Sequence, residues 1–495
     1  MLALQSNSSA RNGAANGTMR THTLRLAVLV GLAAKAAPAP AQANDGADSS
    51  RHRNYVVPAV ELTVFLAGLN AYDRVAYANE VQDGQKVFNS TLTTAWDHLR
   101  EQRWVHDQDP FNVNQFGHPY QGALMYGLPR SSGLGFWTSL VYSNVGSFAW
   151  EMAGETSAPS INDLITTGQA GSLLGETLYR MADLVLKDNG GEVARRFHQY
   201  LALVLSPPTA LNRHLAGRRL KIGLPDSAPA TAWQVGIGAT ADAHAHDPQL
   251  APTQLRRDIA AEFSMSYGLP GTPGYDYTRP LDYFDFEVSG LSSGSNPIEN
   301  VMLRGLLLGR KTSDRGSSRG IWGLYGSYDY ISPFLFRVSS TALSLGTTRQ
   351  YRLAPTLALQ GSVLGGIGYG AAGSAPVAST TPTAEKVRDY HFGVTPQSLV
   401  ALRFIAGDRA TVDLTARGYY VSGLGSDDTH GSETIFRGSA GFNLRVVGGH
   451  TLGARFVEST RSARYGTLPD RRSSEGTITI GYYFLGSNHF NAVKW

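Results

Sequence analysis

Side chains that can bind a metal or move a proton are concentrated between residues 107 and 118. Asp107 and Asp109 supply carboxylates, Asn114 supplies an amide, and His118 supplies an imidazole. Divalent cations bind such oxygen ligands, and a histidine beside carboxylates can act as a general acid or base. We therefore take Asp107 and Asp109 as candidate metal ligands and His118 as the centre of a candidate catalytic site. No cofactor is predicted apart from this divalent metal.

More charged side chains occur inside apolar segments further along the chain. Glu151 and Glu155 share one face of a predicted helix, and Glu176 and Arg180 have the spacing of a pair along a helix. An isolated buried charge is costly, so we expect its partners to lie close to it. The sequence predicts one shared polar cluster, made of Asn114, His118, Arg130, Glu151, Glu155, Asn162, Asp163, Glu176 and Arg180.

Three interpretations of these residues remain open. His118, Glu151 and Asp163 could form a catalytic or metal site. The cluster could instead only fix the packing of the helices, or it could line a surface for a ligand or partner. The chain contains no HExxH motif and no EF-hand loop. Whether the protein is an enzyme therefore stays open at this point.

The segments that hold these side chains have the apolar spacing of helices. Ser160 is placed to cap one of them, with Asp163 in the reciprocal capping position. Pro207 and Pro208 should end the last of them. We predict a small helical bundle over residues 52–215. Its helices are expected at 60–73, 91–104, 135–155 and 170–186, and near 191–205.

Residues 228–495 alternate between apolar and polar side chains with a period of two. From Phe436 to Val446, every second residue is apolar or small and those between are mostly polar. About twelve such segments follow one another, and links near the end of the chain are alternately short and long, as in outer-membrane barrels. The sequence thus predicts an α+β chain in two parts, a helical bundle and then a C-terminal antiparallel transmembrane β-barrel.

Charged residues of both signs fall on the face of these strands that should point inward. In a narrow lumen they could pair with one another, or the arginines could line a path for an anionic solute. The residues concerned are Asp285, Glu287, Arg304, Asp413, Arg417, Arg437, Arg445 and Arg455.

Composition excludes several classes of protein. The net charge is only +4 over 495 residues and no long basic run occurs, so nucleic acid is not a predicted partner. The mean hydropathy of −0.18 excludes a polytopic helical membrane protein but not a barrel with a polar lumen. The chain has no cysteine, which excludes disulfides and thiolate metal sites.

Residues 20–43 have the pattern of an export signal. A short basic region precedes an apolar stretch at 26–34, and cleavage after Ala43 would leave Asn44 as the mature start. The chain ends on an aromatic residue, Trp495, shortly after the last strand. We therefore expect the barrel-assembly machinery and outer-membrane lipid as partners. An even number of strands would place both barrel ends, and hence the helical domain, on the periplasmic side.

The helical part also carries a recognisable order of motifs. It runs through Trp104, Asp109-Pro110-Phe111, Asn114, Gly117-His118-Pro119, Gly122, Tyr126, Arg130-Ser131, Trp150-Glu151, Pro159-Ser160-Ile161-Asn162-Asp163 and Gly175-Glu176. Over about residues 90–185, this order resembles a bacterial domain-of-unknown-function family, DUF3943. The resemblance implies an exported protein of the Gram-negative cell envelope that often continues into a barrel. It implies no activity.

Two classes of function follow. The first is an outer-membrane barrel with a periplasmic or lumen-plugging helical domain, acting in envelope organisation or transport. The alternative is an envelope hydrolase acting on lipid, lipopolysaccharide or cell-wall material. It would use a polar site centred on His118, or else His430 and Ser432 in an external loop.

Overall fold

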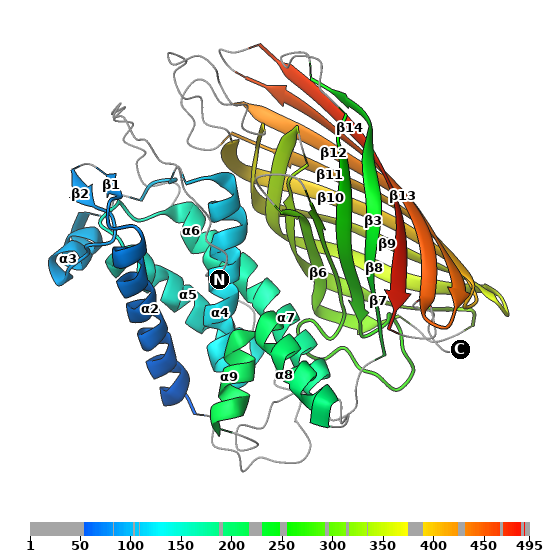
Figure 1. Cartoon of the computed structure of the whole chain (residues 1–495), viewed down its shortest axis with the longest axis horizontal. Helices are drawn as coiled ribbons and strands as arrows, with labels where there is room; N and C mark the ends of the chain where they lie inside the picture. Colours follow the sequence, from blue (N-terminus) through cyan, green and yellow to red (C-terminus); the bar gives the residue numbers. More distant parts are fainter. Residues whose placement is uncertain are drawn as a thin grey trace. The chain divides into compact units, whose positions relative to one another are not determined.

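The chain separates into two compact units, Met1–Leu224 and Pro225–Trp495, shown in Figure 1. The predicted export signal, the mature start at Asn44, His430 and Trp495 all lie outside the described residues. The computed structural model describes residues 54–82, 84–101, 104–107, 109–187, 192–216, 230–247, 255–292, 297–312, 316–333, 335–374, 390–423, 431–465, 469–486 and 490.

The first unit is a bundle of helices packed around a central one. The central helix, α4, contacts α2, α5, α7 and α9. Two π-helical turns, η1 and η2, lead into α4 and α7, and a short hairpin joins β1 to β2. The elements are α2 (Val56–Ala76), β1 (Val81–Gln82), β2 (Gln85–Lys86), α3 (Leu92–Glu101), η1 (Val113–Gly117), α4 (His118–Ser131), α5 (Phe136–Ala153), α6 (Ile161–Ile165), η2 (Thr166–Ala170), α7 (Gly171–Lys187), α8 (Glu192–Leu205) and α9 (Pro207–Ala216).

Two glycines allow α4 to approach η2 and α7 closely. A Cβ atom on Gly122 would lie 1.9 Å from the carbonyl oxygen of Thr167, and one on Gly171 would lie 2.6 Å from the Cα of Gly122. No side chain fits between these backbones. The contact holds the start of α4 against the segment that follows α6, and it thereby brings the predicted polar residues of the two regions together.

The prolines at 207 and 208 do not only end α8, as the sequence suggested. They also begin α9, because Pro207 is its first residue. A proline fits the first turn of a helix, where its missing N–H has no intrahelical partner. The sequence pattern had placed a helix end here and missed the helix start.

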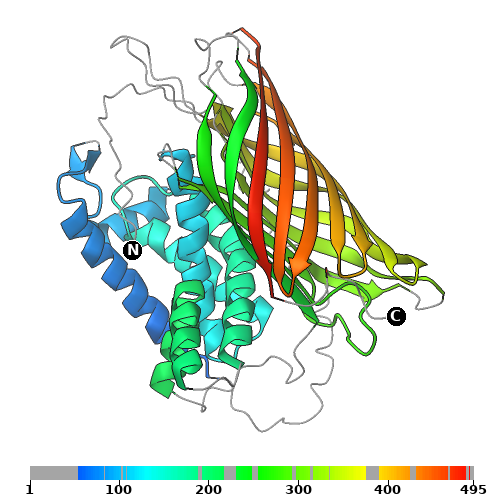
Figure 2. The ribbon, with the colours of Figure 1, turned by 45° about the vertical axis from the view of Figure 1, so that its right-hand side comes forward.

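The second unit is a closed antiparallel barrel of twelve strands, which confirms the predicted fold class (Figure 2). Neighbours in sequence pair with each other, and β14 pairs with β3 to close the barrel. The strands are β3 (Thr231–His246), β4 (Arg257–Tyr267), β5 (Phe284–Leu291), β6 (Ile298–Lys311), β7 (Ser318–Ile331), β8 (Phe336–Ala354), β9 (Leu357–Ser374), β10 (Tyr390–Ala406), β11 (Ala410–Val421), β12 (Ser432–Val447), β13 (His450–Arg464) and β14 (Arg471–Leu485).

The outer surface of the barrel is apolar where the sequence alternation predicted it. In β12, Phe436, Phe442 and Leu444 are exposed, and in β14 Ile480 is exposed. A closed barrel leaves no backbone edge unpaired, and this property lets strands cross a hydrocarbon layer. An apolar exterior on a closed barrel is the arrangement of a transmembrane barrel.

The links between strands alternate in length along the second half of the barrel. Only residues 355–356, 407–409 and 448–449 separate β8 from β9, β10 from β11 and β12 from β13. Gly407 and Gly448 have positive φ angles that suit such tight turns. At the opposite end, residues 375–389 and 422–431 form much longer links. One link at the short-turn end, residues 268–283 between β4 and β5, is also long.

Candidate functional site

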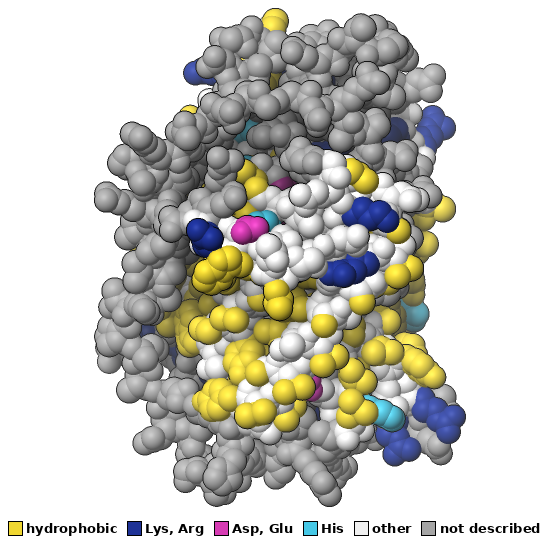
Figure 3. All heavy atoms as spheres, turned by 90° about the vertical axis from the view of Figure 1, so that its left-hand side faces the viewer, with side chains coloured by type: hydrophobic (Ala, Val, Ile, Leu, Met, Phe, Trp, Pro, Cys, Tyr) yellow, Lys and Arg dark blue, Asp and Glu magenta, His cyan; other side chains and the backbone are white. Residues whose placement is uncertain are grey.

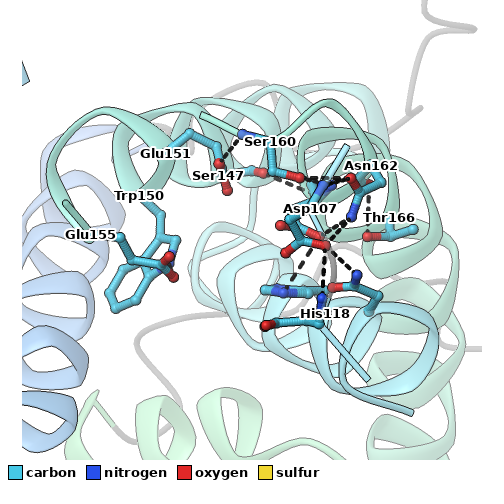
Figure 4. A network of polar contacts seen from close by, with 12 residues as sticks. Asp107, His118, Ser147, Trp150, Glu151, Glu155, Ser160, Asn162 and Thr166 are labelled. Carbon is cyan, nitrogen blue, oxygen red and sulfur yellow. Dashed lines mark hydrogen bonds and ion pairs between the residues drawn. The ribbon is translucent and has the colours of Figure 1, made fainter. Parts of the chain in front are cut away.

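Asp107 lies at the centre of a polar network in the helical unit, drawn in Figure 4. Its Oδ1 accepts a hydrogen bond from Nδ2 of Asn162 at 3.0 Å and a second one from Nδ2 of Asn114. Its backbone N–H donates to Oδ1 of Asn162 at 3.0 Å. Asn162 also donates to Oδ1 of Asp163 at 2.7 Å. Two asparagines thus hold the Asp107 carboxylate in one orientation.

A short parallel bridge brings residue 107 beside the start of α6. Val105 pairs with Ser160, with Val105 N donating to Pro159 O at 2.9 Å and Ile161 N donating to Val105 O at 2.8 Å. Ser160 caps α6, since its hydroxyl accepts a hydrogen bond from the backbone of Asp163. The sequence predicted this cap. The bridge could not be seen from sequence because it joins segments with no strand pattern.

The acceptor for the backbone N–H of the capping residue, Ser160, comes from another helix. The backbone N–H of Ser160 donates to Oε2 of Glu151 at 2.6 Å, and Glu151 belongs to α5. The sequence placed Asp163 in this role. In the structure Asp163 instead turns towards His118, whose Nε2 lies 3.5 Å from its Oδ1. All three candidate catalytic residues are therefore within one network.

Burial controls the protonation of this pair. It lowers the pKa of His118 below its ordinary value, although Asp107 and a hydrogen bond with the side chain of Gln121 act in the opposite direction. It raises the pKa of Asp163 well above its ordinary value, and the nearby charges of Asp107 and Glu151 raise it further. The imidazole is thus favoured in its neutral form, in which a ring nitrogen can serve as a metal ligand.

Glu151 and Glu155 enlarge the excess of carboxylates around the network. Burial and the neighbouring Glu155 raise the pKa of Glu151 well above its ordinary value. Burial also raises the pKa of Glu155, despite hydrogen bonds from Ser157 and from the indole N–H of Trp150. In the part of the chain that the structure describes, no lysine or arginine forms an ion pair with Asp107, Asp163 or either of these glutamates.

Three of the side chains could share one cation. Asp107, Asp109 and His118 each offer one ligand atom, and these atoms lie within 4.8 Å of one another. Asp107 and His118 are partly buried, whereas Asp109 is exposed. One imidazole and two carboxylates at this spacing form a small group of the kind that binds divalent ions. The structure therefore brings the two candidate metal ligands, Asp107 and Asp109, close to the candidate catalytic residue His118.

The remaining predicted polar residues form a second network around Glu176. Its Oε2 accepts from Nε of Arg130 at 2.7 Å and from the hydroxyl of Tyr126 at 2.8 Å, and its Oε1 accepts from Nε of Arg180 at 2.7 Å. The guanidinium of Arg130 also stacks over the ring of Tyr179. The described contacts therefore divide eight of the nine predicted residues between two networks, while Glu155 bonds to Trp150 and Ser157 beside the first of them.

Glu176 is ionised in this network. Its burial would raise its pKa, but Arg130 and Arg180 beside it bring the pKa below its ordinary value. Sequence analysis missed Tyr126 and Tyr179. Their positions, four residues before Arg130 and three after Glu176, are the signal that could have identified them, because such spacings bring side chains to one helix face.

Ion pairs occupy the lumen of the barrel. Arg304 pairs with Asp285 at 2.6 Å, Arg417 with Asp329 at 2.9 Å, and Arg403 with Asp413. Arg455 bridges Glu262 at 2.7 Å and Glu287 at 2.5 Å. Of the other arginines predicted to face inward, Arg437 donates to the hydroxyl of Ser459 and Arg445 lies 3.8 Å from Asp408. The described contacts match the interpretation of lumen-filling pairs rather than an arginine-lined path.

Two clusters of buried apolar side chains lie inside the barrel, one on each side of this charged layer. One contains Phe336, Val338 and Ile435. The other contains Tyr277 and Tyr283 from the long link between β4 and β5, packed against Tyr325 and Leu364. A cavity of about 150 Å³ lies beside the charged layer. It is lined by Arg304 and Asp413 and extends to Trp233 and Leu485, near the start of β3 and the end of β14. A cavity of this size accommodates water or one small molecule about as large as benzene.

Part of the helical unit matches a known family model. Residues 103–208 match the family model of DUF3943, a domain of unknown function. The match confirms the resemblance seen in the sequence. The DUF3943 region contains both networks, from Asp107 to Arg180, but none of the barrel strands. No curated protein matches the chain.

Solved structures with similarity to the chain align over about half of it. The NanC porin is 8% identical, with 51% of this chain and 98% of that chain covered and a TM-score of 0.27. An outer membrane channel from Pseudomonas putida F1 is 9% identical, with 53% and 97% covered and a TM-score of 0.28. The translocator domain of the autotransporter NalP from Neisseria meningitidis is 16% identical, with 57% and 99% covered and a TM-score of 0.24. The barrel fold itself rests on the strand pairing described above.

Proposed function

We propose that this chain is an outer-membrane protein whose barrel holds a DUF3943 domain on the periplasmic side, and that this domain binds a divalent cation at Asp107, Asp109 and His118. The proposal divides the chain into a helical domain, residues 52–215, and a barrel, residues 228–495. The convergence of three ligand atoms within 4.8 Å carries it. The nearby carboxylates of Asp163, Glu151 and Glu155, which form no ion pair with an arginine or lysine among the described residues, support the same conclusion.

The packed lumen favours anchoring over solute transport. Arg455 bridges two glutamates across the lumen, and buried apolar residues pack inside the barrel on either side of the charged layer. Moving a solute through would require breaking buried ion pairs, and separating one partner from such a pair is strongly unfavourable. We infer a role in organising the cell envelope, with the helical domain as the functional part.

Orientation and assembly follow from the strand count. Twelve strands return both ends of the barrel to one side of the membrane, the side of the short turns. In outer-membrane barrels that side is the periplasm. The helical domain precedes β3 and would therefore begin there. Insertion by the barrel-assembly machinery and contact with outer-membrane lipid belong to the same proposal.

The ligand set indicates the kind of cation. Magnesium and calcium prefer oxygen ligands alone, whereas an imidazole suits first-row transition ions such as Mn²⁺ and Zn²⁺. Metal ligation needs a neutral histidine, and burial of His118 favours that form. The cation would offset the mutual repulsion of the carboxylates around Asp107.

An envelope hydrolase remains a second candidate, and one observation favours it. His118 lies beside Asp163, and both are in the network of Asp107. A histidine oriented by a carboxylate is the usual arrangement of a general base. In this alternative, His118 would accept a proton from a water molecule that attacks the substrate, instead of binding the cation.

Metal titration of the full-length protein in detergent tests the proposal. Mn²⁺ binding, followed by electron paramagnetic resonance, should saturate at one ion per chain. Asp107→Asn and His118→Ala should each weaken binding at least about tenfold, which corresponds to ~1.4 kcal/mol. Asp97→Asn in α3 and His214→Ala in α9 are matched controls, because these exposed side chains lie outside the network, and they should bind as the wild type does.

The pH dependence gives a second readout. The pKa values of Glu151 and Asp163 are raised, so these groups lose protons as the pH rises and the negative charge around the site increases. Affinity for Mn²⁺ should therefore be higher at pH 8 than at pH 6. Wild-type protein that binds no Mn²⁺ or Zn²⁺, or binds it equally well without Asp107 and His118, would contradict the metal site.

A further inference from the structure

Helix α2 presents a stripe of apolar side chains to solvent along its whole length. Val56, Val60, Val64 and Val75 are between 56% and 80% exposed. Their spacing of four, four and eleven residues places them on one face of a helix. Ala67 and Ala71 lie on the same face and are also exposed. A stable soluble domain rarely leaves such a face uncovered.

A neighbouring helix extends this apolar surface. Trp137, Val141, Val145 and Phe148 are exposed on α5 and are spaced to share one helix face. Helix α5 contacts α2, and the Tyr142 hydroxyl donates to the backbone carbonyl of Tyr55 at 2.7 Å. Figure 3 looks at the side of the molecule on which α2 lies in Figure 1, and it shows hydrophobic side chains gathered there with few charged ones among them.

The two ordinary explanations for such a helix do not apply to α2. It has 21 residues and is long and apolar enough to cross a membrane, yet only 17% of its most apolar stretch is buried. A core helix would be mostly buried. An export signal would be removed, and the predicted signal ends at Ala43, before α2 begins at Val56. The apolar face of α2 therefore belongs to the mature protein and needs another explanation.

The other face of α2 shows that the helix does not cross a membrane alone. Leu62 packs against Met125 and Leu128 of α4, and Glu61 accepts a hydrogen bond from Asn212 of α9. Asp73 is buried in the bundle. Removing α2 from these contacts would expose the centre of the bundle. The helix is therefore suited to lie on a membrane surface with one face inserted.

The barrel keeps the helical unit close to such a surface. Residues 217–230 are the only chain between the end of α9 at Ala216 and the start of β3 at Thr231. At roughly 3.5 Å per residue, this segment spans at most about 50 Å. A membrane is therefore the one extended apolar surface that is always within reach of α2, provided that the barrel spans it.

We propose that the apolar face of α2 and α5 docks on the phospholipid surface of the membrane that holds the barrel, with its valines at the boundary between headgroups and acyl chains. Burying these side chains removes apolar area from water, as it does for other in-plane helices. The inference rests on the proposed placement of the barrel in the outer membrane. It adds a second, independent contact with lipid.

The absence of native cysteine makes this contact directly measurable. Single-cysteine variants Val60→Cys, Val64→Cys and Val141→Cys would carry an environment-sensitive fluorophore. Gln199→Cys is the control, because Gln199 is exposed in α8 outside the α2 and α5 face. The full-length protein would be placed in vesicles of zwitterionic and anionic phospholipid, with and without lipids that carry a nitroxide quencher on the acyl chain.

Docking predicts a blue-shifted emission at the three valine positions and loss of about half or more of their fluorescence with quencher lipids, as expected for side chains at the acyl boundary. The Gln199 position should be unaffected. Equal and weak quenching at all four positions would overturn the proposal. So would ready disulfide formation between two copies at Val64→Cys together with absent quenching, which would identify a second chain as the occupant.

Failure of the barrel proposal would look different. A barrel outside the membrane would show no heat-dependent shift in gel migration, and the labelled protein would not float with vesicles. Heat-dependent migration and flotation together with unquenched valine positions would reject only the docking of α2 and α5.

Discussion

Glu176 is a single acid placed between two arginines in the centre of the helical unit. Its carboxylate accepts hydrogen bonds from Arg130, Arg180 and Tyr126, and its side chain is fully buried. The two cations compensate for its burial and bring its pKa below the ordinary value. Removing the acid would leave two buried guanidinium groups facing each other, which is far more costly than removing an exposed pair.

We therefore expect Glu176→Gln to destabilise the helical unit by about 3–5 kcal/mol. Thermal or urea unfolding followed by circular dichroism at the helical signal would measure it. Because the pKa of Glu176 is lowered, its stabilising effect is present above the ordinary carboxyl pKa and is lost only as the pH falls through the lower value. The difference in unfolding free energy between Glu176→Gln and the wild type should therefore be constant around neutral pH.

Asp97→Asn in α3 serves as the control, because an exposed substitution of this kind changes stability by only about 0.5 kcal/mol or less. If Glu176→Gln unfolds at the same temperature and urea concentration as the wild type, the two arginines must have other compensation. The buried-ion account would then be wrong.

At the same scale, the sequence predicted which residues would be in the networks better than how they would pair. Asn162 and Asp163 follow from short polar side chains beside the helix start expected at Ser160. Asp107 follows from the dense polar stretch that begins there. The bond from Ser160 to Glu151 could not be predicted, because it joins α6 to a residue nine positions earlier in a different helix. The spacing of residues in the sequence predicts partners along one helix, as for Glu176 and Arg180. It does not predict contacts between side chains of different helices.

Among the elements, α4 is a helix that the sequence pattern did not predict, as it did not predict α9. The first turn of α4 contains Pro119 and its last turn contains Pro129, with Gly122 and Gly127 between them. By propensity these residues oppose a helix. Pro119 is tolerated because the first turn needs no N–H donor from it. Gly122 is required by the close approach to η2 and α7, so tertiary packing here outweighs local preference.

Gly122→Ala should therefore disrupt the helical unit. The added methyl group would lie 1.9 Å from the Thr167 carbonyl oxygen, and neither backbone can yield without moving its helix. We expect a loss of about 3 kcal/mol or more, at the upper end for overpacked positions, seen as a lower unfolding temperature of the helical signal.

Gly68→Ala in α2 is the matched control. An added Cβ there meets nothing within 4 Å, and alanine is preferred to glycine inside a helix by roughly 0.5–1 kcal/mol. The two substitutions should thus act in opposite directions. Equal stability of the Gly122→Ala variant and the wild type would show that α4 and α7 do not meet as described.

For the whole molecule, the fold class could be predicted from the sequence. Period-two alternation and alternating link lengths identify a barrel because they reflect lipid on one face and lumen on the other. The strand count near twelve followed from the number of alternating segments. The packing of the long link between β4 and β5 could not be predicted from sequence. Tyr277 and Tyr283 become buried only because the link folds against Tyr325 and Leu364.

A closed barrel predicts heat-dependent migration on gels. Its twelve-strand ladder has no free edge from which detergent can begin to separate strands at room temperature. Unheated samples should therefore run faster than boiled ones, and the protein should fractionate with outer membranes. Identical migration before and after boiling, together with recovery in a soluble periplasmic fraction, would contradict the barrel in a membrane.

The join between β3 and β14 also sets an order of events while the chain folds. Gln234 pairs with Leu485, so the last contact that completes the barrel must wait for nearly the whole chain to emerge from the ribosome. The hydrogen bonds inside each helix join residues that are close in sequence, and such short-range contacts form faster than long-range strand pairs. Until β14 arrives, β3 presents an open edge that favours aggregation. One polypeptide thus combines an early-folding part with a part that has to be kept unfolded until it reaches its membrane.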